Sequence, residues 1–518
     1  MKIKLILIPL LCLCAGLARA ATFDLTTATI SDIHAAVDSG KLTYEKLVQL
    51  YIERIAAYDK CGPSINAVIT VNARALSDAR ALDAEYKAKG RRSPLHGIPV
   101  AVKDCIDTLY MADSGGALAL RNSFPNQDAF VVQQLRAAGA IIFLKTNLAE
   151  FAGSADGLNS ACTLGGQPRN PYNLDRHPDG SSSGTAAGLA AVFATVGLGT
   201  ETGSSTRGPA YHNNLVGLAP TEGLVSRSGV IPNSWTLDRV GLLGRYVSDV
   251  AMMLSHSTGL DTADTVTSAS AGHIPSTYEK DLRVDGLKGA RIGVFRAVFT
   301  SNDPRTKEAQ AIANAAIEDL KKAGAIVLDP VTIPENVEEL TNTPSLGPAE
   351  TAEWKNKYFA GLPPEAPIHN LEELLRDGGI LYNKFEPFKA ALTSGPTDKY
   401  PGYTADLAKR AKLRAALTRL LDGQKLDALV YLHNLYPAQY INELYPYTKV
   451  KLSSVSGLPG LVVPSGFTSL DQSVGIEFLG RAFDEAKLLR LGYSYEQATK
   501  HRRLPATTPS LPGEKIIY

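Results

Sequence analysis

The sequence predicts an α/β protein in which helices cover both faces of a mixed, twisted sheet. Segments with helical periodicity alternate along the chain with short apolar runs of strand length. Hydrophobic residues make up 44% of the 518 residues, which is ordinary for a globular protein, and we find no internal repeats. These observations favour a layered core, in one large domain or in two to three smaller ones.

The N-terminus has the pattern of a signal peptide. Two lysines precede the apolar residues 5–13, a run too short to span a membrane, and Ala-Arg-Ala at 18–20 fits a cleavage site. Residues 1–20 are therefore predicted to be removed on export to the periplasm or the medium, which leaves residues 21–518. An uncleaved anchor is the alternative, and no later run is long and apolar enough to cross a bilayer.

The first half of the remaining chain alternates helices with strands. Helical periodicity covers residues 29–58, with a break at Gly40 and a new helix capped by Thr43. We then predict strands at 67–71, 100–102 and 140–144, helices at 72–89 and 128–140, and loops with short strands at 217–232.

The second half continues the same pattern around one irregular stretch. We predict helices at 247–254, 307–323 and 483–499, and strands at 290–295, 324–328, 427–431, 460–463 and 474–479. Residues 330–403 are rich in proline and are predicted to be an irregular insertion that faces the substrate. The polar tail after His501 is predicted to be peripheral.

Charge and residue spacing exclude several classes of function. The 53 basic and 52 acidic residues nearly cancel, so the totals show no basic surface for nucleic acid or anionic membranes. The nine histidines lack zinc-site spacing and there is no Walker loop, so we expect no metal and no cofactor. Cys61, Cys105 and Cys162 allow at most one disulfide and are expected to be packed thiols. The oligomeric state stays open.

Residues 179–207, DGSSSGTAAGLAAVFATVGLGTETGSSTR, are polar at both ends and apolar between them. This pattern predicts a loop, a buried helix and a second loop, an arrangement that holds serine hydroxyls at a fixed separation. Gly180 to Gly184 also fit G-x-S-x-G, centred on Ser182. A nucleophile elbow needs an apolar strand before the serine, and residues 175–179 form none, so we reject that interpretation.

A lysine can replace histidine as the base that activates a serine. Lys103 directly follows the predicted strand at 100–102, where it either reaches out to solvent or is held inside for a function. Burial would lower its pKa and make the neutral amine available near pH 7. A second serine can relay the proton, because a hydroxyl both donates and accepts.

Six segments in order resemble the amidase signature family. They are GIPVAVKD at 97–104, DGSSSGTAA at 179–187, GLGTETGSSTRGPA at 197–210, VGLAPTEGLVSRSGVIP at 216–232, SGLPGLVVPSGF at 456–467 and GRAFDEAKLL at 480–489. The resemblance covers nearly the whole mature chain. It implies that residues 21–518 form a catalytic domain with the fold of that family, and that the chain hydrolyses an amide to an acid and ammonia or an amine.

The resemblance also implies roles for individual residues. Ser205 resembles the nucleophile that forms the acyl-enzyme, Ser181 the bridging serine after a cis peptide bond, and Lys103 the base. Backbone N–H groups of Thr202, Gly203, Ser204 and Ser205 resemble the oxyanion hole. The implied partner is a small-molecule amide.

The sequence departs from the family pattern at several positions. Asp179 stands where glycine is usual, Glu201 where aspartate is usual, and Cys105 where asparagine is common. Ser204 replaces a glycine of the oxyanion loop, where a side chain restricts the backbone angles. None of these changes removes a catalytic group.

Two further residues and two further functions complete the prediction. Arg207 and Asp104 are predicted to pair around the site without a catalytic role. The alternative functions are a non-catalytic binding protein and a glutamine-dependent amidotransferase subunit. The substrate pocket is expected to draw on residues 151–159 and 330–450.

Overall fold

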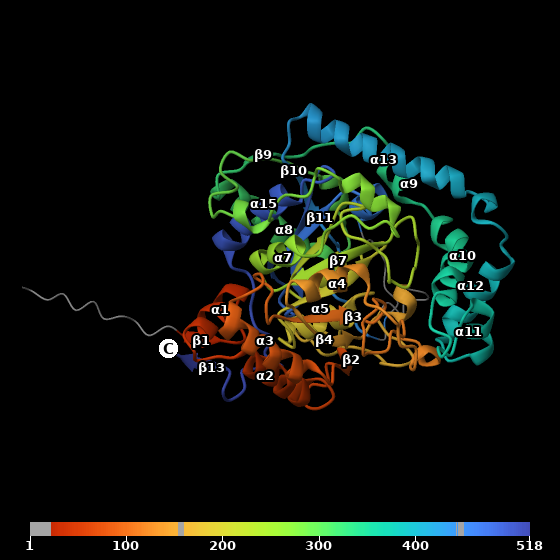
Figure 1. Ribbon diagram of the computed structural model, residues 1–518. Coiled ribbons are helices and arrows are strands. Elements are labelled where there is room, and N and C mark those ends of the chain that lie inside the picture. Colours follow the sequence, from red (N-terminus) through yellow and green to blue (C-terminus); the bar gives the residue numbers. More distant parts are fainter. Residues whose placement is uncertain (1–21, 154–159, 442, 444–449) are drawn as a thin grey trace, which may run out of the picture.

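The computed structural model describes residues 22–153, 160–441, 443 and 450–518 (Figure 1). The predicted signal peptide and part of the predicted pocket, at 154–159 and 444–449, lie outside these residues. In the part of the chain that is described, no helix is long and apolar enough to cross a membrane.

One mixed sheet runs through the molecule in the order β2-β4-β3-β5-β7-β6-β11-β12-β10-β8-β9. The pairs β3–β4, β3–β5, β8–β10 and β8–β9 are parallel and the other pairs are antiparallel, as the sequence predicts for a mixed sheet. The strands are β2 (Val68–Val71), β3 (Pro99–Lys103), β4 (Ile141–Thr146), β5 (Val196–Glu201), β6 (Val216–Ala219), β7 (Arg239–Gly244), β8 (Arg291–Val294), β9 (Ile326–Leu328), β10 (Ala428–Leu432), β11 (Gly460–Phe467) and β12 (Ser473–Leu479).

Helices pack on both faces of this sheet (Figure 1). A Cβ atom at Gly217 would overlap Ala210 of one helix, and a Cβ atom at Gly244 would meet Val250 of another. Gly217 pairs with Leu243, the neighbour of Gly244. Successive residues of a strand point to opposite faces, so the two helices, α6 and α7, lie on opposite faces.

The α-helices are α1 (Ile30–Asp38), α2 (Tyr44–Tyr58), α3 (Ala75–Lys89), α4 (Phe130–Ala137), α5 (Ser183–Ala190), α6 (Arg207–His212), α7 (Val247–Ser255), α8 (Lys307–Lys322), α9 (Val337–Thr341), α10 (Leu346–Ala360), α11 (Leu371–Asp377), α12 (Tyr382–Thr393), α13 (Tyr403–Gly423), α14 (Leu452–Ser456) and α15 (Glu485–Thr499). They match the predicted ones at α1 to α5, α7, α8 and α15, whereas α6 and α9 to α14 were not predicted. Thr43 caps α2 as predicted, because its hydroxyl accepts a hydrogen bond from the backbone N–H of Lys46.

The apolar part of residues 179–207 contains more than the predicted buried helix. The helix is α5, and it is followed by the central strand β5, which the sequence analysis missed. Both elements are fully buried. The two serine loops, one with Ser181 and the other with Ser205, therefore lie before the start of α5 and after the end of β5.

The prediction of an irregular stretch at 330–403 is wrong. Helices α9, α10, α11 and α12 occupy much of it, and α10 to α12 pack together at one side of the molecule (Figure 1). Pro348 lies in the first turn of α10, where its missing N–H has no helical partner to lose.

The chain after His501 is more than a peripheral tail. A short strand, β13 (Lys515–Ile517), pairs with β1 (Thr22–Asp24) near the N-terminal helices (Figure 1). Beside it, Glu514 forms a buried ion pair with Arg54 of α2. The tail therefore joins the two ends of the described chain.

Candidate active site

Lys103 ends β3 and turns inward. Its side chain is 0% exposed, and its Nζ donates hydrogen bonds of 2.7 Å to the Oγ of Ser181 and of 2.7 Å to the Oγ1 of Thr200. Burial lowers the pKa of Lys103 to about 8, although Cys105, Asp238 and Glu201 oppose that shift. The lysine does not reach out to solvent.

Ser181 lies on the loop that leads into α5, directly after a cis peptide bond between Gly180 and Ser181. Its carbonyl accepts a 3.0 Å hydrogen bond from the N–H of Ala149. Asp179, at the position where the family usually has glycine, has a φ of 64°, a left-handed conformation that aspartate tolerates better than most residues.

The two serine loops are joined by their backbones. The N–H of Ser182 donates a 3.1 Å hydrogen bond to the carbonyl of Ser205. The Oγ of Ser182 accepts from the N–H of Thr200 at 3.3 Å, so Ser182 has a structural position beside β5. Three parts of the site therefore meet at one end of the central strands β3 and β5. They are Lys103, Ser181 and the segment that carries Ser205.

The loop between β5 and α6 borders a cavity of about 330 Å³. Thr202, Gly203, Ser204 and Ser205 line it. The N–H groups of Gly203, Ser204 and Ser205 make no hydrogen bond within the described part of the chain. The backbone of Ser204 does not have a positive φ, so its side chain adds no strain to the loop.

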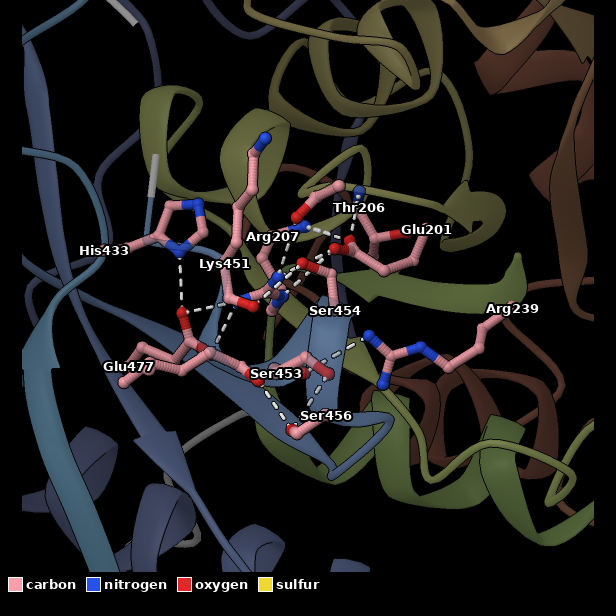
Figure 2. Close-up of polar contacts among 12 residues, drawn as sticks. Glu201, Thr206, Arg207, Arg239, His433, Lys451, Ser453, Ser454, Ser456 and Glu477 are labelled. Carbon is pink, nitrogen blue, oxygen red and sulfur yellow. Dashed lines mark hydrogen bonds and ion pairs between the residues drawn. The ribbon is translucent and has the colours of Figure 1, made fainter. Parts of the chain in front are cut away.

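Arg207 holds this loop from behind. Figure 2 shows its guanidinium between the carboxylates of Glu201 and Glu477, at 2.8 Å and 2.6 Å. Its Nη2 also donates to the carbonyl of Gly203 at 3.2 Å. Burial raises the pKa of Glu201, but Arg207 and Arg239 outweigh that effect and hold the pKa below its ordinary value.

Further partners make the carboxylate of Glu477 the centre of a buried network. Tyr431 donates to it at 2.7 Å. The Nδ1 of His433 lies 2.6 Å from it, as Figure 2 shows. The predicted pairing of Arg207 is thus confirmed. Asp104 likewise contacts Lys145 at 3.4 Å and accepts a hydrogen bond from Ser114.

The rest of the cavity comes from segments far apart in sequence. Its other lining residues are Ala152, Gly153, Asn233, Ser234, Leu237, Thr343, Gly347, Lys451, Ser454 and Val455. Both regions expected to form the pocket contribute, the first through Ala152 and Gly153 and the second through Thr343 and Gly347. Helix α14, the residue before it and residues 233–237 add the remainder of the wall.

Sequence reasoning missed several residues at or beside the site. Thr200 lies inside a quoted motif and could have been found from its neighbours. Asn233 and Lys451 carry no sequence signal of this kind. Lys355 of α10 is also buried, with a pKa that burial lowers to about 8, and it donates to the carbonyl of Pro232.

In the described part of the chain, the cysteines form no disulfide and no group of side chains forms a metal site. Cys61, Cys105 and Cys162 are free thiols, the first exposed and the other two buried. Among the described residues, no group of three or more histidine, cysteine or acidic side chains has the geometry to hold a metal ion.

Comparison with known proteins identifies the family. Residues 46–489 match the family model Amidase. A probable amidase of Arabidopsis thaliana is 34% identical over 516 residues, covering 94% of this chain and 93% of its own length. One subunit of the glutamyl-tRNA(Gln) amidotransferase of Roseiflexus sp. (strain RS-1) is 34% identical, covering 92% and 98%.

A solved structure agrees with these sequence matches. The native peptide amidase of Stenotrophomonas maltophilia superposes with a TM-score of 0.84 at 35% identity, covering 93% of this chain and 99% of that one. The mixed sheet and its helices are thus those of amidase-signature structures. The chain belongs to the amidase family, whose enzymes hydrolyse amides.

Proposed function

We propose that this chain is an exported amidase that cleaves a linear carboxylic amide through an acyl-enzyme on Ser205. The observation that carries the proposal is the buried Lys103, whose Nζ lies 2.7 Å from the Oγ of Ser181 beside the loop of Ser205. A neutral lysine in that position is a base for a serine relay.

The proposed reaction has two steps. Ser181 gives its proton to Lys103 as it takes the proton of Ser205, and the Ser205 Oγ attacks the amide carbonyl. The relay then runs backwards and protonates the leaving nitrogen, so the C–N bond breaks and ammonia or an amine departs. Water attacks the resulting ester by the same relay, which releases the acid and restores Ser205.

The negative oxygen of the intermediate needs donors in the cavity wall. The N–H groups of Gly203, Ser204 and Ser205 have no acceptor in the described chain, and Thr202 lies at the start of the same loop. Removing one donor from such a site typically lowers kcat about 100- to 1000-fold. Arg207, through the Gly203 carbonyl, keeps the loop in place.

Mutation of the nucleophile tests the proposal. Ser205→Ala is expected to abolish release of ammonia or amine from a panel of peptide, aryl and fatty amides, with unchanged thermal unfolding. Ser182→Ala is the matched control, because that serine has no catalytic role in this mechanism. Full turnover by Ser205→Ala, or failure of a fluorophosphonate to label Ser205 in the wild-type protein, would contradict the mechanism. Absent labelling would favour a non-catalytic binding protein.

The proposed location rests on the sequence of residues 1–20. Export predicts a mature N-terminus at Ala21, which N-terminal sequencing of the secreted or periplasmic protein measures. A protein that keeps residue 1 and stays in the cytoplasm would contradict it.

A glutamine-dependent amidotransferase subunit is the second candidate, because such subunits are among the relatives at 34% identity. That function predicts ammonia release from glutamine that depends on partner subunits. The amidase function predicts turnover of amides by the isolated chain. Assays of the purified chain alone distinguish the two.

A further inference from the structure

Among the described residues that line the cavity beside Ser205, Lys451 is the one with a charged side chain. It directly precedes α14, whose Ser454 and Val455 line the same wall. The other described lining residues are neutral. The ammonium group of Lys384, behind the wall, already donates to the carbonyl of Gly153 at 2.6 Å, so Lys451 is the lining residue that can offer a positive charge to a ligand.

No acidic side chain neutralises Lys451 in the described part of the chain. It forms no ion pair there, and its ammonium group has no dashed contact in Figure 2, where the side chain extends away from the Arg207 network. Glu335 and Glu338 line a neighbouring cavity that shares Lys451, but neither pairs with it, and Glu335 pairs with Arg419.

The acidic groups behind the cavity wall are already bound. Asp238 accepts hydrogen bonds from the hydroxyl of Thr202 at 2.6 Å and from the N–H of Asn233 at 2.8 Å. Glu350 accepts from the hydroxyl of Ser234 at 2.8 Å. The cavity is lined by the neutral partners of these carboxylates, Thr202, Asn233 and Ser234. The described part of the wall therefore has no negative charge that could neutralise Lys451.

We propose that Lys451 is a specificity-determining residue that binds a carboxylate of the substrate, and that the preferred substrates are small amides carrying such a group. This inference rests on the proposed amidase function. A carboxylate supplies the counter-charge that the wall lacks, and a lysine ammonium binds it as a point charge from several directions.

The exposure of Lys451 and the direction of its pKa shift are consistent with binding of a ligand from solvent. The side chain as a whole is exposed, yet desolvation of its ammonium at the wall lowers its pKa. A bound carboxylate acts in the opposite direction and favours the charged form. The cavity volume of about 330 Å³ lies at the lower end of the range for small-molecule sites.

Paired substrates test the inference. Each amide of the panel that carries a carboxylate has a neutral partner of the same length, such as N-acetylglutamic acid α-amide and N-acetylmethionine amide. For the wild-type protein we expect kcat/KM to be about tenfold higher for the acidic member. Lys451→Met should remove this preference through the KM of the acidic member, and Lys451→Glu should reverse it. The readout for each variant is the ratio of kcat/KM for the acidic member to kcat/KM for the neutral member.

Lys321→Met is the matched control, because Lys321 is an exposed lysine of α8 in a surface ion pair with Glu318. It should keep the wild-type preference. Equal kcat/KM values for the paired amides, or a preference that survives Lys451→Met, would overturn this inference and leave the amidase proposal intact. Absence of any turnover in the wild-type protein would overturn both.

Discussion

The side chain of Lys103 is buried where the charged ammonium form is unfavourable. Its two direct partners, Ser181 and Thr200, are neutral hydroxyls, and no carboxylate of the described residues contacts it. Desolvation therefore dominates and lowers the pKa to about 8. A residue of this kind is a poor ion-pair partner and a suitable base.

The activity is expected to rise with pH through about 8, because only the neutral form of Lys103 can take a proton. Thr200 accepts a hydrogen bond from the Nζ, which favours the charged form, so Thr200→Val should move the midpoint to lower pH. The measurement is kcat/KM against pH for both proteins. A pH-independent wild-type profile, or a midpoint that moves upward in the variant, would contradict the role of Lys103.

Lys103→Met supplies a stability control for that experiment. It should lower kcat at least about 100-fold. The pKa of Lys103 is about 8 in the folded protein and 10.5 ordinarily, so the unfolded chain binds more protons between these values. The free energy of unfolding of the wild-type protein should therefore rise relative to Lys103→Met from pH 8 to 10.5, as measured by urea denaturation. A relative fall would contradict the lowered pKa of the buried lysine.

At the scale of elements, the site depends on the strand β5, the loop after it and the helix α6. The sequence did not predict β5, because two glycines in six residues weaken a strand signal. The structure explains them: a Cβ atom at Gly197 would lie 2.7 Å from Thr185 of α5, and one at Gly199 would meet Ser182. Close packing of α5 on β5 requires glycine at both positions. Local sequence patterns do not show which segments pack together, so they could not reveal this requirement.

The loop of Gly203, Ser204 and Ser205 is expected to lose its position when the carboxylate of Glu477 is removed from Arg207. Glu477→Ala leaves the guanidinium buried with one acidic partner, and breaking such a pair costs about 3–5 kcal/mol of unfolding free energy. Because Arg207 also binds the Gly203 carbonyl, kcat should fall as well. Urea denaturation and initial rates measure the two effects.

Glu477→Gln is the control for that substitution, since it keeps the shape of the side chain and can still accept from Arg207. It should lose less stability and less activity than Glu477→Ala. If Glu477→Ala retained both the wild-type stability and the wild-type kcat, Arg207 would not be holding the loop through Glu477.

At the scale of the whole molecule, local patterns predicted the fold class and many of its elements, and the contacts between distant segments were not predicted. The motifs around Lys103, Ser181 and Ser205 were visible because each is continuous in sequence. The cavity wall was not, since it joins residues from distant segments, such as Asn233 and Lys451. Helices α9 to α12 were missed because prolines before, within and between them resemble an irregular chain, and the long helix α13 that follows was missed as well.

The C-terminal tail illustrates how a polar segment can be part of the core. Arg54 of α2 is fully buried, and its guanidinium donates to Glu514 at 2.8 Å, to the carbonyl of Thr508 at 2.9 Å and to that of Ala191 at 2.9 Å. Ala191 caps the C-terminus of α5. One side chain thus ties the N-terminal helices, the tail and the helix that follows Ser181.

Removal of the Glu514 carboxylate from its ion pair with Arg54 should destabilise the whole protein without changing the catalytic rate. Glu514→Ala leaves Arg54 buried without its acidic partner, so the free energy of unfolding should fall by about 3–5 kcal/mol. The neighbouring Lys515→Ala removes an exposed ion pair with Asp24 and should change it by about 0–1 kcal/mol. Urea denaturation measures both, and kcat below the unfolding transition should stay near the wild-type value in each variant. Equal small losses for the two variants would show that the tail is peripheral after all, because only a buried anchor makes Glu514 differ from its exposed neighbour.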